Sequence, residues 1–485
     1  MSLTSALNTA QAIFRNTGEQ TSVISTNIAN DGNANYVRRA PVVVNTIYGA
    51  STVSTERAQQ MALLRQLTEA NSASSAQDAL LTGLTTLSNA LGGNDYELSP
   101  STYLAQLQNS LEAFAASPGE YTLAATVVTD AQDVAKSLNA ASTTVQNLRT
   151  ETDAEIVTQV AELNRLLAEF KDVNDAVVGA MAVGADASNA LDSRDTLLKE
   201  ISKIVGIDSS VRANGDMVLY TTDGTTLFET LPRSVTFTRT LSYDATVTGN
   251  AVYIDGVAVE PGEGGNTTAA GSLSALLQLR DEIAPTFQIQ LDEVARGLVE
   301  AFAESDPLGV AADMPGLFTW AGGTMPTSGT VQPGLAATIT VSNAVIATAG
   351  GNPMLVRDGG INGATYDWNT GDNSGFTTLL MKYSDALDAD RPFDASAELK
   401  TTMSIMNFAS GSIGWLEELR SNATTASDNK VALYERSFQS YSSETGVNLD
   451  EELSLLLDVE QSYKATAKLV STIDEMLKAV LEMAG

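Results

Sequence analysis

The fold is decided by the stretch LDEELSLLLDVEQSYKATAKLVSTIDEMLKAVL, residues 449–481. Its apolar residues recur at alternating steps of four and three, which is the pattern of a coiled-coil helix, and Glu460 and Asp474 interrupt it. A helix with so narrow an apolar stripe cannot bury it alone, so it needs a partner in the same chain or in another. Asn448 is a suitable N-cap for this helix, and Gly446 ends the preceding segment.

The first thirty residues mirror this last stretch. Residues 3–28 carry apolar residues at mostly three- and four-residue steps, which predicts a helix, and an Asn- and Gly-rich loop follows at residues 30–35. We predict that residues 1–40 and 446–485 form a terminal coiled-coil assembly domain, with packing inside one monomer as the alternative. The predicted self-assembly seam consists of Leu3, Ala6, Ala10, Ile13, Ile24, Ile28, Leu449, Leu453, Leu456, Tyr463, Ala467, Val470, Leu477 and Leu481.

Between the two ends, the pattern is mainly that of long helices. The expected helices cover residues 56–91, 100–114, 121–179, 188–205, 272–304, 376–387 and 395–445, with a kink at Pro285. Strands are expected at residues 217–220 and 235–238, and a tight hairpin at residues 252–259 around Asp255-Gly256. The predicted fold class is therefore mainly α with a β-rich part, an α+β chain built on a long helical bundle.

The helical body is predicted to comprise residues 41–305 and 369–445, with a β-hairpin region near residues 207–260. Residues 306–368 are rich in Gly, Pro and Thr and contain short β-like runs such as residues 337–345. We therefore predict a small β-rich inserted domain over residues 306–368. This nesting places the two terminal segments side by side, as in a protein that is layered along an axis.

The composition argues against catalysis. The chain carries 27 basic and 59 acidic residues, and a net charge of −32 repels nucleic acid and anionic lipid. Cys and His are both absent, which removes the cysteine nucleophile, the histidine base and the Cys/His zinc site. Residues 367–372 match a calcium loop poorly, because its sixth-position Gly and twelfth-position Glu are missing. We expect no catalytic residues, no cofactor, no metal and no nucleic-acid partner.

The sequence also bears on the route of the chain through the cell. Residues 1–15 lack the basic cluster and apolar core of an ordinary secretory signal. No apolar run approaches the length of a membrane-spanning helix. We therefore expect no insertion into a membrane.

Three stretches resemble the flagellar axial family of rod, hook and junction proteins. Residues 25–30, Ser-Thr-Asn-Ile-Ala-Asn, followed by Tyr36-Val37-Arg38, look like the N-terminal box of the family. Residues 446–452 and residues 189–207 are similar to segments of its hook-associated members at the hook–filament junction. Asn35 stands where the family usually has Gly, and we expect Asn35 to adopt the same positive φ. The motif residues are Asn27, Ile28, Ala29, Asn30, Tyr36, Asn448, Leu449, Asp450 and Glu451.

The resemblance implies a structural subunit that joins hook to filament and self-assembles through its terminal helices after type III export. It implies a secreted protein of the extracellular flagellum, at the hook–filament junction. Its implied partners are the hook protein, a second junction protein, its own copies in a ring, and a cytoplasmic export chaperone. The expected chaperone-binding residues are Leu453, Leu456, Leu477 and Leu481.

Two other functions stay open at this point. Residues 471–477 resemble the tail of rod and hook proteins, which favours a hook or distal-rod subunit, although hook outer domains are mostly β. A coiled-coil surface adhesin belongs to a different class, and the missing signal and anchor argue against it.

Overall fold

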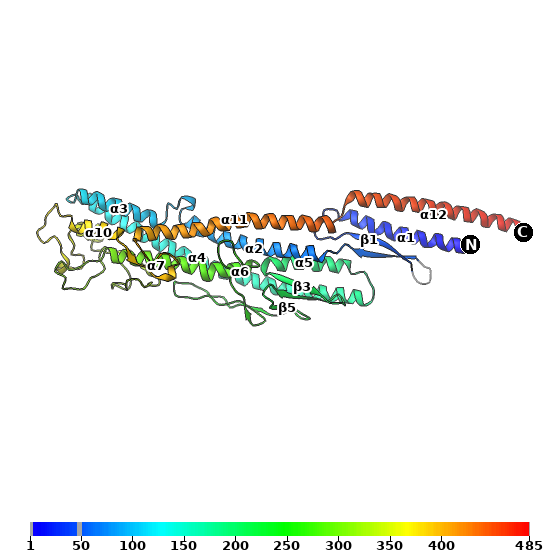
Figure 1. Cartoon of the computed structure of the whole chain (residues 1–485), viewed down its shortest axis with the longest axis horizontal. Coiled ribbons are helices and arrows are strands. Elements are labelled where there is room, and N and C mark those ends of the chain that lie inside the picture. Colours follow the sequence, from blue (N-terminus) through cyan, green and yellow to red (C-terminus); the bar gives the residue numbers. More distant parts are fainter. Residues whose placement is uncertain (1–2, 46–50, 485) are drawn as a thin grey trace. The chain divides into compact units, whose positions relative to one another are not determined.

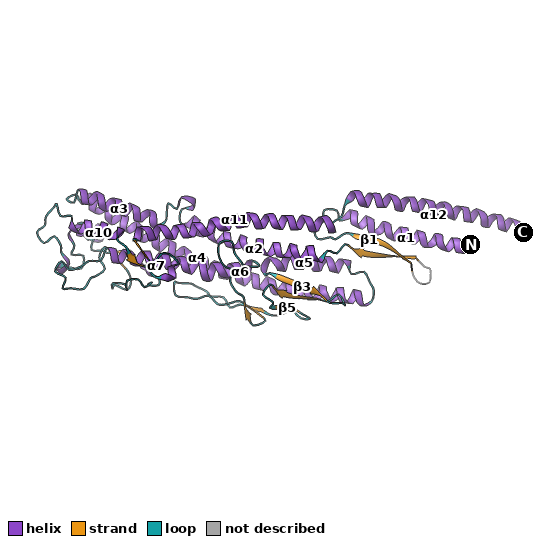
Figure 2. Cartoon of the chain, in the orientation of Figure 1, coloured by secondary structure: helices purple, strands orange, loops and turns teal. Residues whose placement is uncertain are grey.

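The computed structural model of the chain describes residues 3–45 and 51–484. The chain forms two compact units. Unit 1 consists of Met1–Ser72, Leu163–Ser234 and Lys430–Gly485, and unit 2 consists of Ala73–Glu162 and Val235–Asn429. Most described residues are helical and the strands are short, which confirms the predicted fold class (Figure 2).

Unit 1 is built from helices and two small antiparallel sheets (Figure 1). Its elements are α1 (Leu3–Ala29), β1 (Arg39–Asn45), β2 (Ser51–Arg57), α5 (Ser188–Ile204), β3 (Ile207–Val211), β4 (Met217–Thr221), β5 (Thr226–Phe228) and α12 (Leu449–Ala484). Strand β1 pairs with β2, and β3, β4 and β5 form a second sheet in that order. Three long helices contribute residues to both units: α2 (Met61–Ala90), α4 (Tyr121–Ala182) and α11 (Ile405–Thr445).

Unit 2 adds shorter helices and very short strands to these long helices. Its elements are α3 (Pro100–Ala116), β6 (Val235–Thr236), β7 (Tyr253–Ile254), β8 (Val257–Ala258), α6 (Ser272–Gln278), α7 (Ala284–Ala301), β9 (Phe318–Thr319), α8 (Leu335–Thr338), β10 (Thr340–Val341), α9 (Leu355–Asp358), α10 (Thr378–Asp388), β11 (Arg391–Pro392) and β12 (Thr402–Met403). A π-helical turn, Leu279–Ile283, lies between α6 and α7 and ends two residues before Pro285.

Helix α3 shows how local sequence sets these elements. The Ser99 hydroxyl caps it by accepting a hydrogen bond from the Thr102 backbone N–H, and Pro100 occupies its first turn. The apolar face predicted from three- and four-residue steps is fully buried in the core of unit 2, as Leu104, Leu107, Leu111 and Phe114. The predicted helix in this part of the chain is therefore confirmed.

Helix α7 holds the surrounding loops of unit 2 through buried charges. The Asp292 carboxylate accepts hydrogen bonds from the backbone N–H groups of Gly334 and Ala336, at 2.9 and 2.8 Å. Arg296 pairs with Glu293 at 2.7 Å, and neither side chain is exposed. The Asp292 contacts tie part of the segment 306–368 to α7.

Three predicted elements differ in the structure. Helix α2 begins at Met61 and not at Glu56, because residues 51–57 pair with β1 over seven positions. Helix α11 begins at Ile405, after a 3-10 turn and the short strand β12. Residues 337–345, predicted as β-like, hold the end of α8 and only a two-residue strand. The independence of residues 306–368 as an inserted domain stays a prediction.

The predicted tight hairpin is confirmed, although its strands are short. Tyr253–Ile254 pairs with Val257–Ala258 across Asp255-Gly256. Both turn residues have positive φ, 49° and 83°, as a type I′ turn requires.

Candidate assembly site at the chain termini

The two terminal helices are partners within unit 1. Helix α1 packs along α12 and also contacts the β1–β2 hairpin (Figure 1). The rings of Phe14 and Tyr463 meet edge to face, with their centroids 5.0 Å apart. Ala10 and Ile24 of α1 are buried, as is Ile473 of α12. The single chain therefore brings both terminal helices together.

The predicted seam on α1 lies mostly in covered positions. Ala10 and Ile24 are buried, and Ala6, Ile13 and Ile28 are half-buried. The first predicted seam residue, Leu3, begins α1, but its side chain lies outside the described part of the structure.

The predicted seam on α12 is rotated partly away from α1, although Tyr463 contacts Phe14. Leu456 and Val470 are half-buried, whereas most of the other predicted positions are exposed. The exposed fractions are 40% for Leu449, 44% for Leu453, 54% for Tyr463, 38% for Leu477 and 71% for Leu481, and Ala467 is exposed as well.

The reason for this rotation is the pair of carboxylates that interrupts the predicted seam. The buried positions of α12 include Thr466 and Ile473. With this orientation, Glu460 and Asp474 stay in solvent, where each pairs with a lysine one helical turn later. Burying either carboxylate without a partner would cost far more than exposing a leucine.

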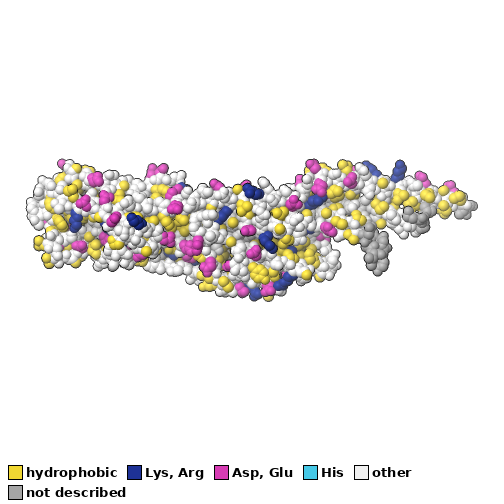
Figure 3. Space-filling model, in the orientation of Figure 1, with side chains coloured by type: hydrophobic (Ala, Val, Ile, Leu, Met, Phe, Trp, Pro, Cys, Tyr) yellow, Lys and Arg dark blue, Asp and Glu magenta, His cyan; other side chains and the backbone are white. Residues whose placement is uncertain are grey.

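Helix α12 consequently has more apolar surface than α1 covers. We call the uncovered part the open face; it consists of Leu449, Leu453, Leu457, Leu469, Met476, Leu477, Val480, Leu481 and Met483. Figure 3 shows apolar side chains at the surface of the α1–α12 pair. Clustered exposed apolar residues on a long helix are typical of a protein–protein contact.

A buried amide connects the two terminal helices. Asn27 of α1 is fully buried, and its side chain makes four hydrogen bonds. Its Nδ2 donates to the Arg39 carbonyl at 2.8 Å and to Glu452 Oε2 at 3.0 Å. Its Oδ1 accepts from the Tyr36 hydroxyl at 2.6 Å and from the Arg39 backbone N–H at 3.2 Å. The satisfied amide fixes the loop after α1 against the start of α12.

Glu452 is the acidic centre of the same contact. Its side chain is 1% exposed, and Arg38 Nε donates to it at 2.6 Å. The Arg38 guanidinium also bonds Glu451 at 2.8 Å, and the Arg38 backbone N–H donates to the Thr445 carbonyl. The predicted N-cap is confirmed, because Asn448 Oδ1 accepts from two backbone N–H groups in the first turn of α12.

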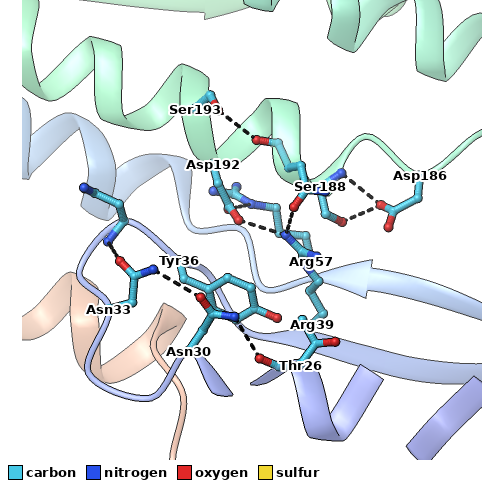
Figure 4. A network of polar contacts seen from close by, with 12 residues as sticks. Thr26, Asn30, Asn33, Tyr36, Arg39, Arg57, Asp186, Ser188, Asp192 and Ser193 are labelled. Atoms are coloured by element: carbon cyan, nitrogen blue, oxygen red, sulfur yellow. Dashed lines mark hydrogen bonds and ion pairs between the residues drawn. The ribbon is translucent and has the colours of Figure 1, made fainter. Parts of the chain in front are cut away.

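The third sequence motif, on α5, meets the first one through two arginines. Arg39 bonds Asn189 at 2.7 Å. It also bonds Asp192 at 3.1 Å (Figure 4). Arg57 of β2 joins Asp192 at 2.8 Å and Asp195 at 2.6 Å. All three motifs, which lie far apart in the sequence, therefore converge within unit 1.

Burial and charge together set the ionisation of this cluster. Burial alone would lower the pKa of Arg57, but Asp195 and Asp192 outweigh it and raise that pKa. Burial raises the pKa of Tyr36 and of Tyr441, whose hydroxyl donates to Asp195 at 3.2 Å. At neutral pH the arginine is therefore charged and both phenols are protonated, which suits ion pairing and positioning of helices.

The remaining motif residues lie around this cluster. Asn30 donates to the Thr26 carbonyl and accepts from Asn33 (Figure 4). Ile28 is half-buried, whereas Ala29 and Asp450 are exposed.

The expected positive φ at Asn35 is wrong. The loop takes its left-handed residue at Gly32, with φ of 74°, and Asn35 does not have a positive φ. The Asn35 side chain instead accepts a hydrogen bond from Lys199 at 2.8 Å. Because Gly32 already supplies the left-handed residue of the turn, Asn35 does not need a positive φ.

The sequence-based site residues did not include the charged groups that hold the cluster together. The missed residues are Arg38, Arg39, Arg57, Asp192, Asp195 and Glu452. Arg38, Asp192, Asp195 and Glu452 stand inside the quoted motifs. Charged residues are usually solvated, so only their recurrence within all three motifs could have marked them.

The described part of the chain also bears on metal binding and on membrane spans. Within residues 3–45 and 51–484, no three acidic side chains are grouped so that they could hold a metal ion. Over the same ranges, every helix is too short or too polar to cross a membrane.

Two family models match the chain. Residues 84–317 match the flagellar hook-associated protein FlgK helical domain. Residues 439–483, which contain the N-cap of α12 and all but its last residue, match the C-terminal region of the flagellar basal body rod FlgEFG proteins. The helical body and the terminal site together define a structural protein of the flagellum.

Individual relatives narrow this class. The chain is 24% identical to flagellar hook-associated protein 1 of Bacillus subtilis, over 90% of this chain and 86% of that protein. It is 28% identical to the Salmonella typhimurium protein of the same name, over 64% of this chain and 56% of that protein. The chain is therefore similar to flagellar hook-associated protein 1 over most of its length, which confirms the resemblance seen in its motifs.

A solved structure supports the fold. The flagellar hook junction protein FlgK from Burkholderia pseudomallei superimposes with a TM-score of 0.57 at 13% sequence identity. The match covers 78% of this chain and all of that one.

Proposed function

We propose that this chain is a structural subunit that joins the flagellar hook to the filament and assembles through α1 and α12. The observation that carries the proposal is the open face of α12, an apolar surface that the chain's own α1 leaves uncovered. The buried network of Asn27 and Glu452 gives this pair of helices a fixed mutual position. A subunit that docks through preformed helices loses less conformational freedom on assembly.

The free energy of burying apolar side chains favours assembly through the open face. Burying one exposed Leu contributes about 1.5–3 kcal/mol when the side chain was fully exposed. Leu453, Leu457 and Leu481 are 44%, 58% and 71% exposed, so their burial would contribute a part of that amount each. Over the whole open face, these contributions offset the cost of ordering and association. Neighbouring copies in a ring, the hook protein and the second junction protein are the proposed occupants.

The proposal also includes how the chain is exported to the junction between hook and filament. Export in an unfolded state through the type III apparatus fits a chain without a single Cys, which has no disulfide to form or break. A cytoplasmic chaperone would cover α12 before export. Of its proposed anchors, Leu453, Leu477 and Leu481 are exposed, and Leu456 is half-buried beside α1. The final location is the extracellular flagellum.

A pair of substitutions tests the proposal. Leu453→Asp combined with Leu481→Asp places two charges on the open face without touching the contact with α1. Gln461→Asp adds a charge at an exposed position of the same helix and serves as the matched control. In cells that lack the natural gene, we expect the double variant to leave hooks without filaments, and the control to restore filaments. Normal filament counts with the double variant present at the junction would reject assembly through the open face.

A further inference from the structure

A short loop of unit 2 displays two large apolar side chains to solvent. Leu308 is 84% exposed and Val310 is 85% exposed, more than any other large apolar residue among those described. We call residues 307–312 the knob. Two scattered apolar residues would need no explanation, but these two stand almost side by side at the tip of one loop.

The knob is held in shape by hydrogen bonds. The carboxylate of Asp306, which is 8% exposed, accepts from the backbone N–H groups of Leu308, Val310 and Ala311 at 2.9, 3.0 and 2.9 Å. At the base of the loop, Glu304 and Met314 exchange two backbone hydrogen bonds, of 2.8 and 2.9 Å. The loop thus presents Leu308 and Val310 in a preorganised form, which lowers the entropy cost of binding.

Unit 2 also carries a groove of matching character. It has a volume of about 580 Å³ and runs between α4, the loop around Tyr243 and α8. Its apolar lining includes Ala245, Trp320, Pro333 and Ala337. This volume falls within the range of about 300–1,000 Å³ that is usual for binding pockets. The knob of the same molecule does not fill it, because Leu308 and Val310 are exposed.

The net negative charge of the chain restricts which surfaces of two copies can come into contact. A net charge of −32 makes copies repel one another, so contact requires surfaces that carry little charge. Residues 307–312 contain no charged side chain. The groove lining contains one, Asp244, whose carboxylate accepts from the Thr246 and Val247 backbone N–H groups of its own loop. The knob and the groove therefore suit each other in charge, and the apolar part of the groove offers a contact for Leu308 and Val310.

We propose that the knob of one subunit inserts into the groove of the next copy of this chain. The partner is thus a second copy, and the contact is heterologous, with different surfaces on its two sides. A heterologous contact that is repeated from copy to copy produces a ring or a helical array. This inference rests on the proposed function, because it supplies a lateral contact for the subunits of the junction.

Cysteine cross-linking tests the contact directly, because the chain has no natural Cys. The variant Leu308→Cys/Ala337→Cys is expressed in place of the natural protein, and isolated flagella are treated with a short bismaleimide. We expect a ladder of covalent dimers, trimers and larger species on a denaturing gel. Leu308→Cys and Ala337→Cys on separate chains, co-expressed, should give dimers and nothing larger. Each single variant expressed alone should stay monomeric.

The outcomes separate this inference from the proposed function. If the double variant is present in flagella but stays monomeric after cross-linking, the knob–groove contact is refuted and the proposed function stands. If the chain is absent from flagella altogether, the proposed function fails first. As a second measurement, Leu308→Glu/Val310→Glu should reduce the number of filaments, whereas Val183→Glu, at a position 79% exposed in unit 1, should not. Equal filament numbers for both variants would also refute the contact.

Discussion

Glu452 is the residue whose removal should most weaken the attachment of α12. It accepts charge-assisted hydrogen bonds from Arg38 at 2.6 Å and from Asn27 at 3.0 Å, and it has almost no contact with solvent. Glu452→Ala breaks both interactions and leaves a cavity. Hydrogen bonds to charged groups contribute about 1.5–3 kcal/mol each.

The expected loss is smaller than the sum of these two contributions. Arg38 is 22% exposed and keeps Glu451 as a partner, so its charge is rehydrated rather than stranded. Asn27 keeps the Arg39 carbonyl as an acceptor. We therefore expect Glu452→Ala to lower the free energy of unfolding of unit 1 by about 2–4 kcal/mol.

Urea unfolding and hydrogen exchange of α12 amides measure this effect. Glu451→Ala is the matched control, because it removes the neighbouring carboxylate, which is 54% exposed and bonds the same arginine. An exposed ion pair contributes about 0–1 kcal/mol, so the free energy of unfolding of the control should stay close to that of the natural chain. Equal losses for the two variants, or unchanged exchange of the first turns of α12 in Glu452→Ala, would refute the role given to the buried carboxylate.

Two further predictions concern a titrating group and two glycines. Burial raises the pKa of Asp292 from 3.8 to about 6, so the folded chain holds this proton more tightly than the unfolded chain. The free energy of unfolding should therefore fall by about 3 kcal/mol as the pH rises from 4 through 6. Urea unfolding at several pH values should show a flatter profile for Asp292→Asn, and an identical profile would contradict this. Gly446→Ala should destabilise unit 1, because the added Cβ would lie 2.5 Å from the Ser442 carbonyl oxygen. The added Cβ of Gly18→Ala on α1 meets no atom within 4 Å, so this variant should be more stable by about 0.5–1 kcal/mol in thermal melts. A Gly446→Ala chain that is more stable than the Gly18→Ala chain would contradict both predictions.

Long-range periodicity made much of this fold predictable. Helix α4 was expected at residues 121–179 and runs from Tyr121 to Ala182, because its apolar residues keep one helical face over many turns. The terminal helices were found for the same reason. The caps Ser99 and Asn448 follow from local chemistry that needs no tertiary partner.

The features that were missed depend on contacts between distant segments. The last two residues of β2, Glu56 and Arg57, were taken for the start of a helix, because the pairing of this strand with β1 is not visible in its own seven residues. The side of α12 that packs on α1 could not be predicted in full, since the burial of a helix is decided by its partner and by where Glu460 and Asp474 can reach solvent. Arg57 and Asp192 look like ordinary surface charges until the fold buries them together.

The accessibility of the open face before and after assembly tests the central claim most directly. Leu453→Cys introduces a single thiol on this face, 44% exposed in the free chain. Its rate of reaction with a small maleimide is measured in purified protein, in isolated flagella and in the same flagella after denaturation. We predict rapid labelling in the free and denatured protein and slowing by about a hundredfold or more in flagella, because a covered site reacts only through rare opening. Equal rates in free protein and in intact flagella would contradict assembly through this face.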